Sequence, residues 1–180
     1  MQTIRRLRDG FYDTDRGLVD YNRLKDCPEF KRYRILANGL RSFNPSRLVG
    51  RKEKLAFWTN LYNTIVVDAI VALGVKESVK EVPEFFRKVK YAIGGHLFSA
   101  DDIEHGILRG NVRPWFHPLK PFGPRDTRRN LILNPADPRV HFALVCGSRS
   151  CPPIEYYDRE RIFDQLEEAA RALSTPQRSW

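Results

Sequence analysis

The strongest hydrophobic pattern in the chain lies between Glu53 and Leu73, where apolar residues recur at nearly helical spacing. The apolar positions lie on most sides of the predicted helix and include Leu55, Trp58, Leu61, Tyr62, Ile65, Ala69 and Leu73. Gly74 follows and is a good C-terminal stop. Because a helix that is apolar nearly all round must be buried, we expect this one at the centre of the fold, with other helices packed around it.

Weaker patterns predict three further helices. Residues 28–37 begin with a proline, which suits the first turn of a helix, and are followed by Asn-Gly, which suits its end. Ser99 is a suitable N-cap for a helix over residues 99–110. Asp158 can cap a final amphipathic helix over residues 158–173.

Strand-like patterns are short. Residues 88–93 alternate, a Gly-Gly pair follows, and residues 96–98 can return as the second strand of a hairpin. The apolar run 139–145 predicts a short buried strand, whereas the six prolines of residues 111–138 predict a long, stiff surface loop. Together the patterns predict an α+β fold, with helices around a central apolar helix and a small, mostly antiparallel sheet.

Length and composition predict a single domain over residues 1–180, since 42% hydrophobic residues is typical of a globular chain. The formal net charge of +9 permits nucleic acid, an anionic membrane or an acidic substrate as partner. The basic residues are scattered and no run reaches five like charges, so nucleic acid is the weakest of these expectations.

The apolar stretch 55–74 has roughly the length of a membrane span. It contains Asn60, Asn63 and Asp68, and polar groups at that depth in a bilayer are costly. We therefore expect a buried core helix and no transmembrane segment. The basic N-terminus lacks the apolar segment of a secretory signal, so we expect a cytoplasmic protein.

Cys146 is the first candidate for chemistry, because it stands at the end of the predicted strand 139–145 and is followed by Gly147 and Ser148. A thiol held there can face a cleft, and a neighbouring base would lower its pKa and make it a nucleophile. Gly147 would let a substrate or a backbone N–H donor approach. The alternative stays open that Cys146 is a small core residue, since free cysteine is often buried.

Cys151, followed by two prolines, more simply belongs to a stiff turn that shapes the site. The C-x4-C spacing is not that of redox or zinc sites, and three cysteines cannot form a disulfide framework in a chain of this size. A metal site from His105, His141 and the two cysteines lacks paired ligand spacing, so we expect no metal and no cofactor. On a strand 139–145, His141 would point away from Cys146.

Glu104 and His105 are adjacent on the predicted helix 99–110, where neighbours point about 100° apart. A lone histidine on a helix is commonly a surface or core residue, and Glu104 can pair with Arg109. A histidine base and a distant cysteine are nevertheless the pair that a thiol hydrolase needs. Asn60 and Asn63 lie one turn apart on the central helix, which predicts buried amides that brace a loop or wall a site.

Three longer motifs occur in order along the chain, namely AFWTNLYNTIVVDAI, YAIGGHLFSADDIEHGILR and DPRVHFALVCGSRSCPPIEYYDRERIFDQLEEAARAL. Together they resemble the domain of unknown function family number 547, from about Asp20 to Leu173. Members of that family continue past the helix matched by residues 159–173 into a further strand-bearing segment. The resemblance therefore leaves two alternatives, a naturally short chain or a fragment.

The resemblance also implies site residues. The glutamate-histidine pair of the family is matched by Glu104 and His105, and its strand-end cysteine by Cys146. It implies a hydrolase site with Cys146 as nucleophile, His105 as base and Glu104 as polar partner. Because an orienting group must reach the imidazole, Asn60 or Asn63 is the alternative to Glu104 in that last role.

Two function classes remain from the sequence. The first is a cysteine-dependent hydrolase or acyl transferase, peptidase-like or amidase-like, that acts on an amide or ester through Cys146 and His105. In it Gly147, Ser148 and Cys151 bind substrate or shape the site. The second is a non-catalytic protein-interaction module with a basic surface, in which the same residues brace the fold. The substrate or protein partner is not evident from the sequence.

Overall fold

A computed structural model describes residues 12–13, 18–19, 27–75, 78–145 and 155–174. The described elements follow one another as β1 (Tyr12–Asp13), β2 (Leu18–Val19), α3 (Pro28–Asn38), the 3-10 turns η1 (Gly39–Ser42) and η2 (Pro45–Arg47), α4 (Gly50–Leu73), the 3-10 turn η3 (Val79–Glu81), α5 (Phe85–Lys88), β3 (Lys90–Ile93), β4 (His96–Ser99), the π-helix η4 (Asp102–Leu108), the 3-10 turn η5 (Thr127–Leu131), α6 (Val140–Ala143) and α7 (Ile162–Ser174).

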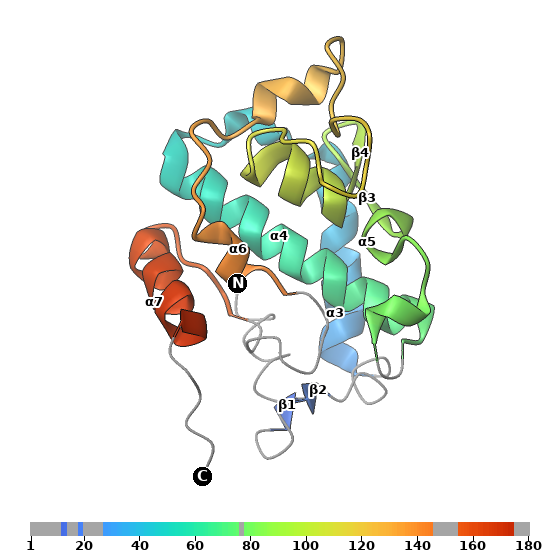
Figure 1. The fold of residues 1–180 in the computed structure, drawn as a ribbon. Coiled ribbons are helices and arrows are strands. Elements are labelled where there is room, and N and C mark those ends of the chain that lie inside the picture. Colours follow the sequence, from blue (N-terminus) through green and yellow to red (C-terminus); the bar gives the residue numbers. More distant parts are fainter. Residues whose placement is uncertain (1–11, 14–17, 20–26, 76–77, 146–154, 175–180) are drawn as a thin grey trace.

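The long helix α4 runs through the middle of the described fold, as predicted (Figure 1). It begins at Gly50, three residues before the predicted start, because the Glu53 carboxylate accepts a 2.6 Å hydrogen bond from the Val49 amide and completes the first turn. Gly74 ends it in the left-handed conformation, with a φ of 64°. The helix is buried on most sides, which confirms that it is the centre of the core.

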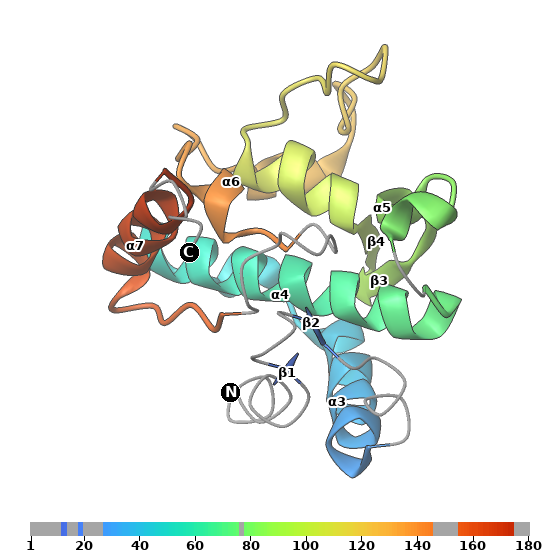
Figure 2. The ribbon, with the colours of Figure 1, turned by 60° about the horizontal axis from the view of Figure 1, so that its bottom comes forward.

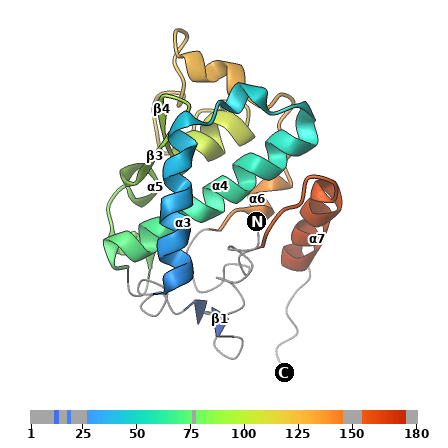
Figure 3. The ribbon, with the colours of Figure 1, turned by 180° about the vertical axis from the view of Figure 1, so that it is seen from behind.

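Other described elements cover α4. The π-helix η4 and the C-terminal helix α7 both contact it. On a further side α3 crosses it, where Cys27 and Phe30 pack against Val67 and Val71 (Figure 3). The predicted helices over residues 28–37 and 158–173 are thus confirmed, although α7 starts only at Ile162.

Among the described residues, each of the two small sheets is an antiparallel pair of strands, which confirms the α+β class. In the β3–β4 hairpin Lys90 pairs with Ser99 and Ile93 with His96. The turn requires glycine at Gly94, where a Cβ atom would lie 2.8 Å from the carbonyl oxygen of Phe43 and the φ is +55°.

Helix α4 is also the one described helix that is long and apolar enough to cross a membrane, but 78% of its most apolar window is buried within the fold. Three polar side chains of α4, those of Asn60, Asn63 and Asp68, form hydrogen bonds there. The carboxylate of Asp68, for example, accepts a 2.5 Å hydrogen bond from the hydroxyl of Tyr91. This confirms the interpretation of residues 55–74 as a core helix and leaves no clear transmembrane segment among the described residues.

The predicted strand over residues 139–145 is wrong, because Val140–Ala143 forms one helical turn, α6. Asp137 starts this turn, since its side chain and its carbonyl accept hydrogen bonds from the amides of Arg139 and Val140. Moreover, the backbone at Ala143 and Val145 is bonded to a side chain of α4 rather than to a strand. His141 is exposed while Ala143 and Val145 are buried, so the predicted sharing of a strand face does not hold.

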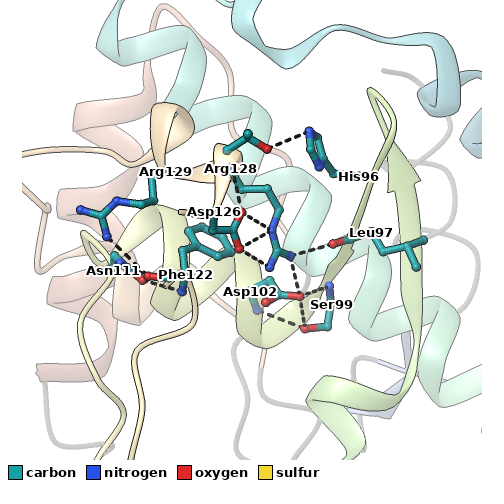
Figure 4. A network of polar contacts seen from close by, with 10 residues as sticks. His96, Leu97, Ser99, Asp102, Asn111, Phe122, Asp126, Arg128 and Arg129 are labelled. Atoms are coloured by element: carbon teal, nitrogen blue, oxygen red, sulfur yellow. Dashed lines mark hydrogen bonds and ion pairs between the residues drawn. The ribbon is translucent and has the colours of Figure 1, made fainter. Parts of the chain in front are cut away.

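The proline-rich segment 111–138 is irregular except for η5, as predicted. Asn111 pins it back on itself, because its amide donates to the carbonyl of Phe122 and accepts from the amide of Phe122, both at 2.9 Å (Figure 4). Arg128 ties it to the hairpin, since the guanidinium donates to the Asp126 carboxylate and to the carbonyl of Leu97. It also lies over the Phe122 ring at 4.4 Å.

Candidate functional site

The candidate nucleophile Cys146 and its neighbours Gly147, Ser148 and Cys151 lie outside the described residues. The described part of the candidate site consists of the elements on either side of them and of the cleft that contains His105.

Two amides of α4 hold the chain on both sides of the segment that carries Cys146. Asn63, only 2% exposed, donates to the carbonyl of Ala143 at 3.1 Å and accepts from the amide of Val145 at 3.0 Å. Asn60 donates to the carbonyl of Tyr157 at 2.8 Å and accepts from its amide at 2.9 Å. Asn63 thus fixes Val145, directly before Cys146, and Asn60 fixes Tyr157, which follows Cys151. The two attachment points lie one helical turn apart on α4.

His105 lies on η4 and is only 7% exposed, with the Phe116 ring in an edge-to-face contact at 5.7 Å. Burial is the main cause that lowers the pKa of His105, and the charges of Arg109 and His141 lower it further. The charge of Glu104 opposes this shift without reversing it. The imidazole is therefore neutral at pH 7, the state in which a histidine can accept a proton.

Among the described hydrogen-bond contacts, Arg109 links Glu104 to His105. The guanidinium Nη1 of Arg109 lies 3.5 Å from Oε1 of Glu104 and 3.4 Å from Nδ1 of His105. Because a guanidinium can only donate, this contact favours the tautomer in which Nδ1 accepts and Nε2 carries the proton. The Glu104–Arg109 ion pair that the sequence allowed is present, and no described hydrogen bond joins Glu104 directly to the imidazole.

Asp101 is a candidate that sequence reasoning missed. It lies four residues before His105, and both line one cleft of about 270 Å³. Burial, and then the negative charge of Glu104, raise the pKa of Asp101 to about 6. A carboxyl group with this pKa can give or take a proton near neutral pH. The i,i+4 spacing of Asp101 and His105 was the available signal, but an aspartate at this position equally suits the positive end of the helix dipole.

The cleft combines acidic and basic groups from several elements. Its side chains come from α5, the hairpin, η4 and the following loop, and include Arg87, Lys90, Asp101, Asp102, His117 and Lys120. Asp102 is fixed there, because Arg128 lies 3.5 Å from its carboxylate, which also accepts from the amide and hydroxyl of Ser99 (Figure 4). Within the described ranges no three His, Cys, Asp or Glu side chains form a group able to hold a metal ion.

The sequence profile of the family described as "Protein of unknown function, DUF547" matches residues 45–173. The chain belongs to this family. The DUF547 match spans α4, η4 and α7, and therefore includes Asn60, Asn63, His105 and the segment that carries Cys146. No curated protein and no solved structure shows a significant match to the chain.

Asp101 is expected to make this DUF547 domain less stable as the pH rises from about 4 to about 6. Its folded-state pKa of about 6 exceeds the unfolded value of 3.8, so the protonated carboxyl group favours folding and its ionisation opposes it. Asp101→Asn, which removes the titration, should be more stable than the parent chain at pH 7 by about 1 kcal/mol, allowing for partial exposure. Urea unfolding at pH 4 and pH 7 measures the difference.

Asp102→Asn is the matched control. It removes the ion pair with Arg128, so it should lower stability at pH 7 rather than raise it. Equal stability of the parent chain and Asp101→Asn at both pH values would show that Asp101 titrates as an ordinary exposed carboxyl group.

Proposed function

We propose that this chain is a thiol-dependent hydrolase or acyl transferase acting on an amide or ester, with Cys146 as nucleophile and His105 as its proton-transfer partner. The observation that carries the proposal is the buried imidazole of His105 at the wall of a cleft, where burial lowers its pKa. The anchoring of Val145 by Asn63 supports it, because α4 also packs against η4, the helix of His105.

The reaction divides into two transfers. His105 takes the proton of the Cys146 thiol, and the thiolate attacks the carbonyl carbon of the substrate. The tetrahedral intermediate collapses to a thioester, and the amine or alcohol leaves with the proton from His105. Water, or an acceptor nucleophile, then gives its proton to His105 and attacks the thioester, which releases the acid or the transferred acyl product and restores the thiol.

Arg109 has a defined part in the first proton transfer. A ring nitrogen of His105 must present its lone pair to the thiol, and Nδ1 faces the guanidinium. Arg109 is partly exposed and already paired with Glu104, so it can leave Nδ1 while keeping that ion pair. This assigns Glu104 an indirect role, as the group that holds Arg109. A reducing compartment such as the cytoplasm would keep Cys146 available as a free thiol.

Alkylation by iodoacetamide between pH 5 and pH 9, followed by peptide mapping, tests the nucleophile. Cys146 is expected to react at neutral pH about tenfold faster than an ordinary thiol, because a neighbouring base increases its thiolate fraction. Cys27, which is buried, supplies an internal reference for a shielded thiol. A second readout is an initial burst of p-nitrophenolate from p-nitrophenyl acetate, with the acetyl group found on Cys146.

His105→Gln should return the alkylation profile of Cys146 to that of a free thiol, with a pKa of about 8.5. His96→Gln, at an exposed histidine on β4, is the matched control and should leave the profile unchanged. If Cys146 behaves as an ordinary thiol in the parent chain, and neither burst nor acetylation is seen, the enzyme proposal fails and the interaction-module alternative takes its place.

A further inference from the structure

We propose that the loop after η4 is a docking surface for anionic membranes. Four large apolar side chains lie exposed within residues 112–119, which we call the apolar loop. Trp115 is 94% exposed and Leu119 68%, while Val112 and Phe116 are about half exposed. Single exposed apolar residues are ordinary on protein surfaces, but a cluster of this kind marks a site of interaction.

The charges around the apolar loop indicate what it meets. Residues 112–125 contain Arg113, Lys120 and Arg125 but no aspartate or glutamate. All three of these cationic side chains are exposed. Each basic residue close to an anionic lipid surface contributes about 1 kcal/mol, and tryptophan is favoured where a membrane meets water. The combination of tryptophan, leucine and positive charge, in a segment without acidic residues, is complementary to an anionic membrane surface.

The shape of the segment supports the same occupant. Between η4 and η5 the yellow segment projects away from the helical body (Figure 2). Its base is rigid, because Asn111 bonds to both backbone groups of the buried Phe122. A projecting tip on a fixed base can enter the interfacial region of a bilayer at little cost in ordering. A protein partner would need a matching pocket for Trp115, which makes it the less favoured occupant.

The position of the loop connects docking with the cleft. The cleft that contains His105 is also lined by three residues of the apolar loop, Pro114, His117 and Leu119, and by Lys120 directly after it. Docking through Trp115 and Leu119 would therefore bring the mouth of the cleft to the lipid surface. The proposal itself uses no chemistry of Cys146 and stands or falls independently of the thiol mechanism.

Co-sedimentation with vesicles tests the proposal. The chain is expected to bind vesicles of equal parts phosphatidylglycerol and phosphatidylcholine, and to bind phosphatidylcholine vesicles at least about tenfold more weakly. Binding should weaken as salt rises. The double variant Trp115→Ser/Leu119→Ser should lose at least about tenfold in affinity for the anionic vesicles, since it removes the inserting side chains.

Ile35→Ser is the control, because Ile35 is an apolar residue on α3, outside the apolar loop, that is about as exposed as Leu119. It should bind vesicles like the parent chain, and thermal unfolding of all variants should confirm that they are folded. Absence of binding to anionic vesicles, or equal binding by the double variant, would overturn the proposal. A third outcome would also overturn it, namely that the parent chain self-associates without binding vesicles and that the double variant no longer self-associates. The loop would then be the contact with a second copy of the chain.

Discussion

Replacement of Asn63 by alanine is expected to lower the free energy of unfolding by about 3 kcal/mol. The amide is buried and satisfies the carbonyl of Ala143 and the amide of Val145, which are themselves buried. Without it, two backbone groups lose their partners in a dry environment, and each such loss costs about 1–3 kcal/mol. Urea unfolding followed by far-UV circular dichroism measures the change.

Asn60→Ala is the natural comparison, because Asn60 makes the same pair of bonds to Tyr157 but is only half-buried. Water can replace part of the hydrogen bonding that Asn60→Ala removes, so the expected loss of unfolding free energy is about 1 kcal/mol. An equal loss of unfolding free energy in the two variants would contradict the conclusion that the hydrogen bonds of Asn63 are shielded from water. Asn63→Ala should also change the alkylation profile of Cys146, because Val145 directly precedes it.

Replacement of Gly106 by alanine is expected to cost about 3 kcal/mol or more. A Cβ atom at Gly106 would lie 2.5 Å from the nearest ring carbon of Phe122, well inside van der Waals contact. Phe122 cannot move aside easily, since Asn111 holds its backbone and Arg128 covers its ring. Overpacking of a fixed core residue typically costs about 1–3 kcal/mol, and here the clash is with a fully buried ring.

Gly123→Ala tests this explanation, because Gly123 directly follows Phe122 but a Cβ atom added there would meet no other atom within 4 Å. It should change stability by less than about 0.5 kcal/mol, as exposed substitutions usually do. A similar loss in both variants would mean that glycine matters here for backbone freedom. A small loss at Gly106 would mean that the segment around Phe122 yields more readily than its contacts indicate.

Both predictions concern the scaffold of the candidate site. Asn63 fixes the chain before Cys146 on α4, and Gly106 allows the helix of His105 to meet the loop that walls the cleft. If the site is catalytic, the two variants should impair thiol reactivity by misplacing groups that they do not remove.

Local features of the fold follow from local sequence. The central helix was predictable because its apolar residues lie on nearly every side, and Gly74 provides a terminating residue that accepts a positive φ. The β3–β4 turn was predictable from Gly94 and Gly95 for a similar reason. The start of the helical segment after Ser99 was also predictable, since the hydrogen bonds between Ser99 and Asp102 join residues only three apart.

The helix of His105 shows where local patterns stop being informative. Its position was predicted, but its π-helical form was not. In this form the backbone amide of Arg109 donates to the carbonyl of Glu104, five residues earlier. An apolar period near four residues does not distinguish a π-helix from an α-helix. The packing of Gly106 against Phe122, sixteen positions away, is a tertiary contact.

By itself the sequence determined the central helix, the hairpin, the flanking helices and the family, because these depend on residues close together in the chain or on long continuous motifs. Only the tertiary structure decided that residues 140–143 form a helical turn, that Asp101 shares the cleft of His105, and that Arg109 stands between His105 and Glu104. The physical reason is competition for hydrogen bonds and for space. The side chain of Asn63, eighty positions before Ala143, hydrogen-bonds to backbone groups that a strand would have paired with its neighbour. Burial in the folded chain, rather than the charge of the neighbouring Glu104, is the largest cause of the shifted pKa values of Asp101 and His105.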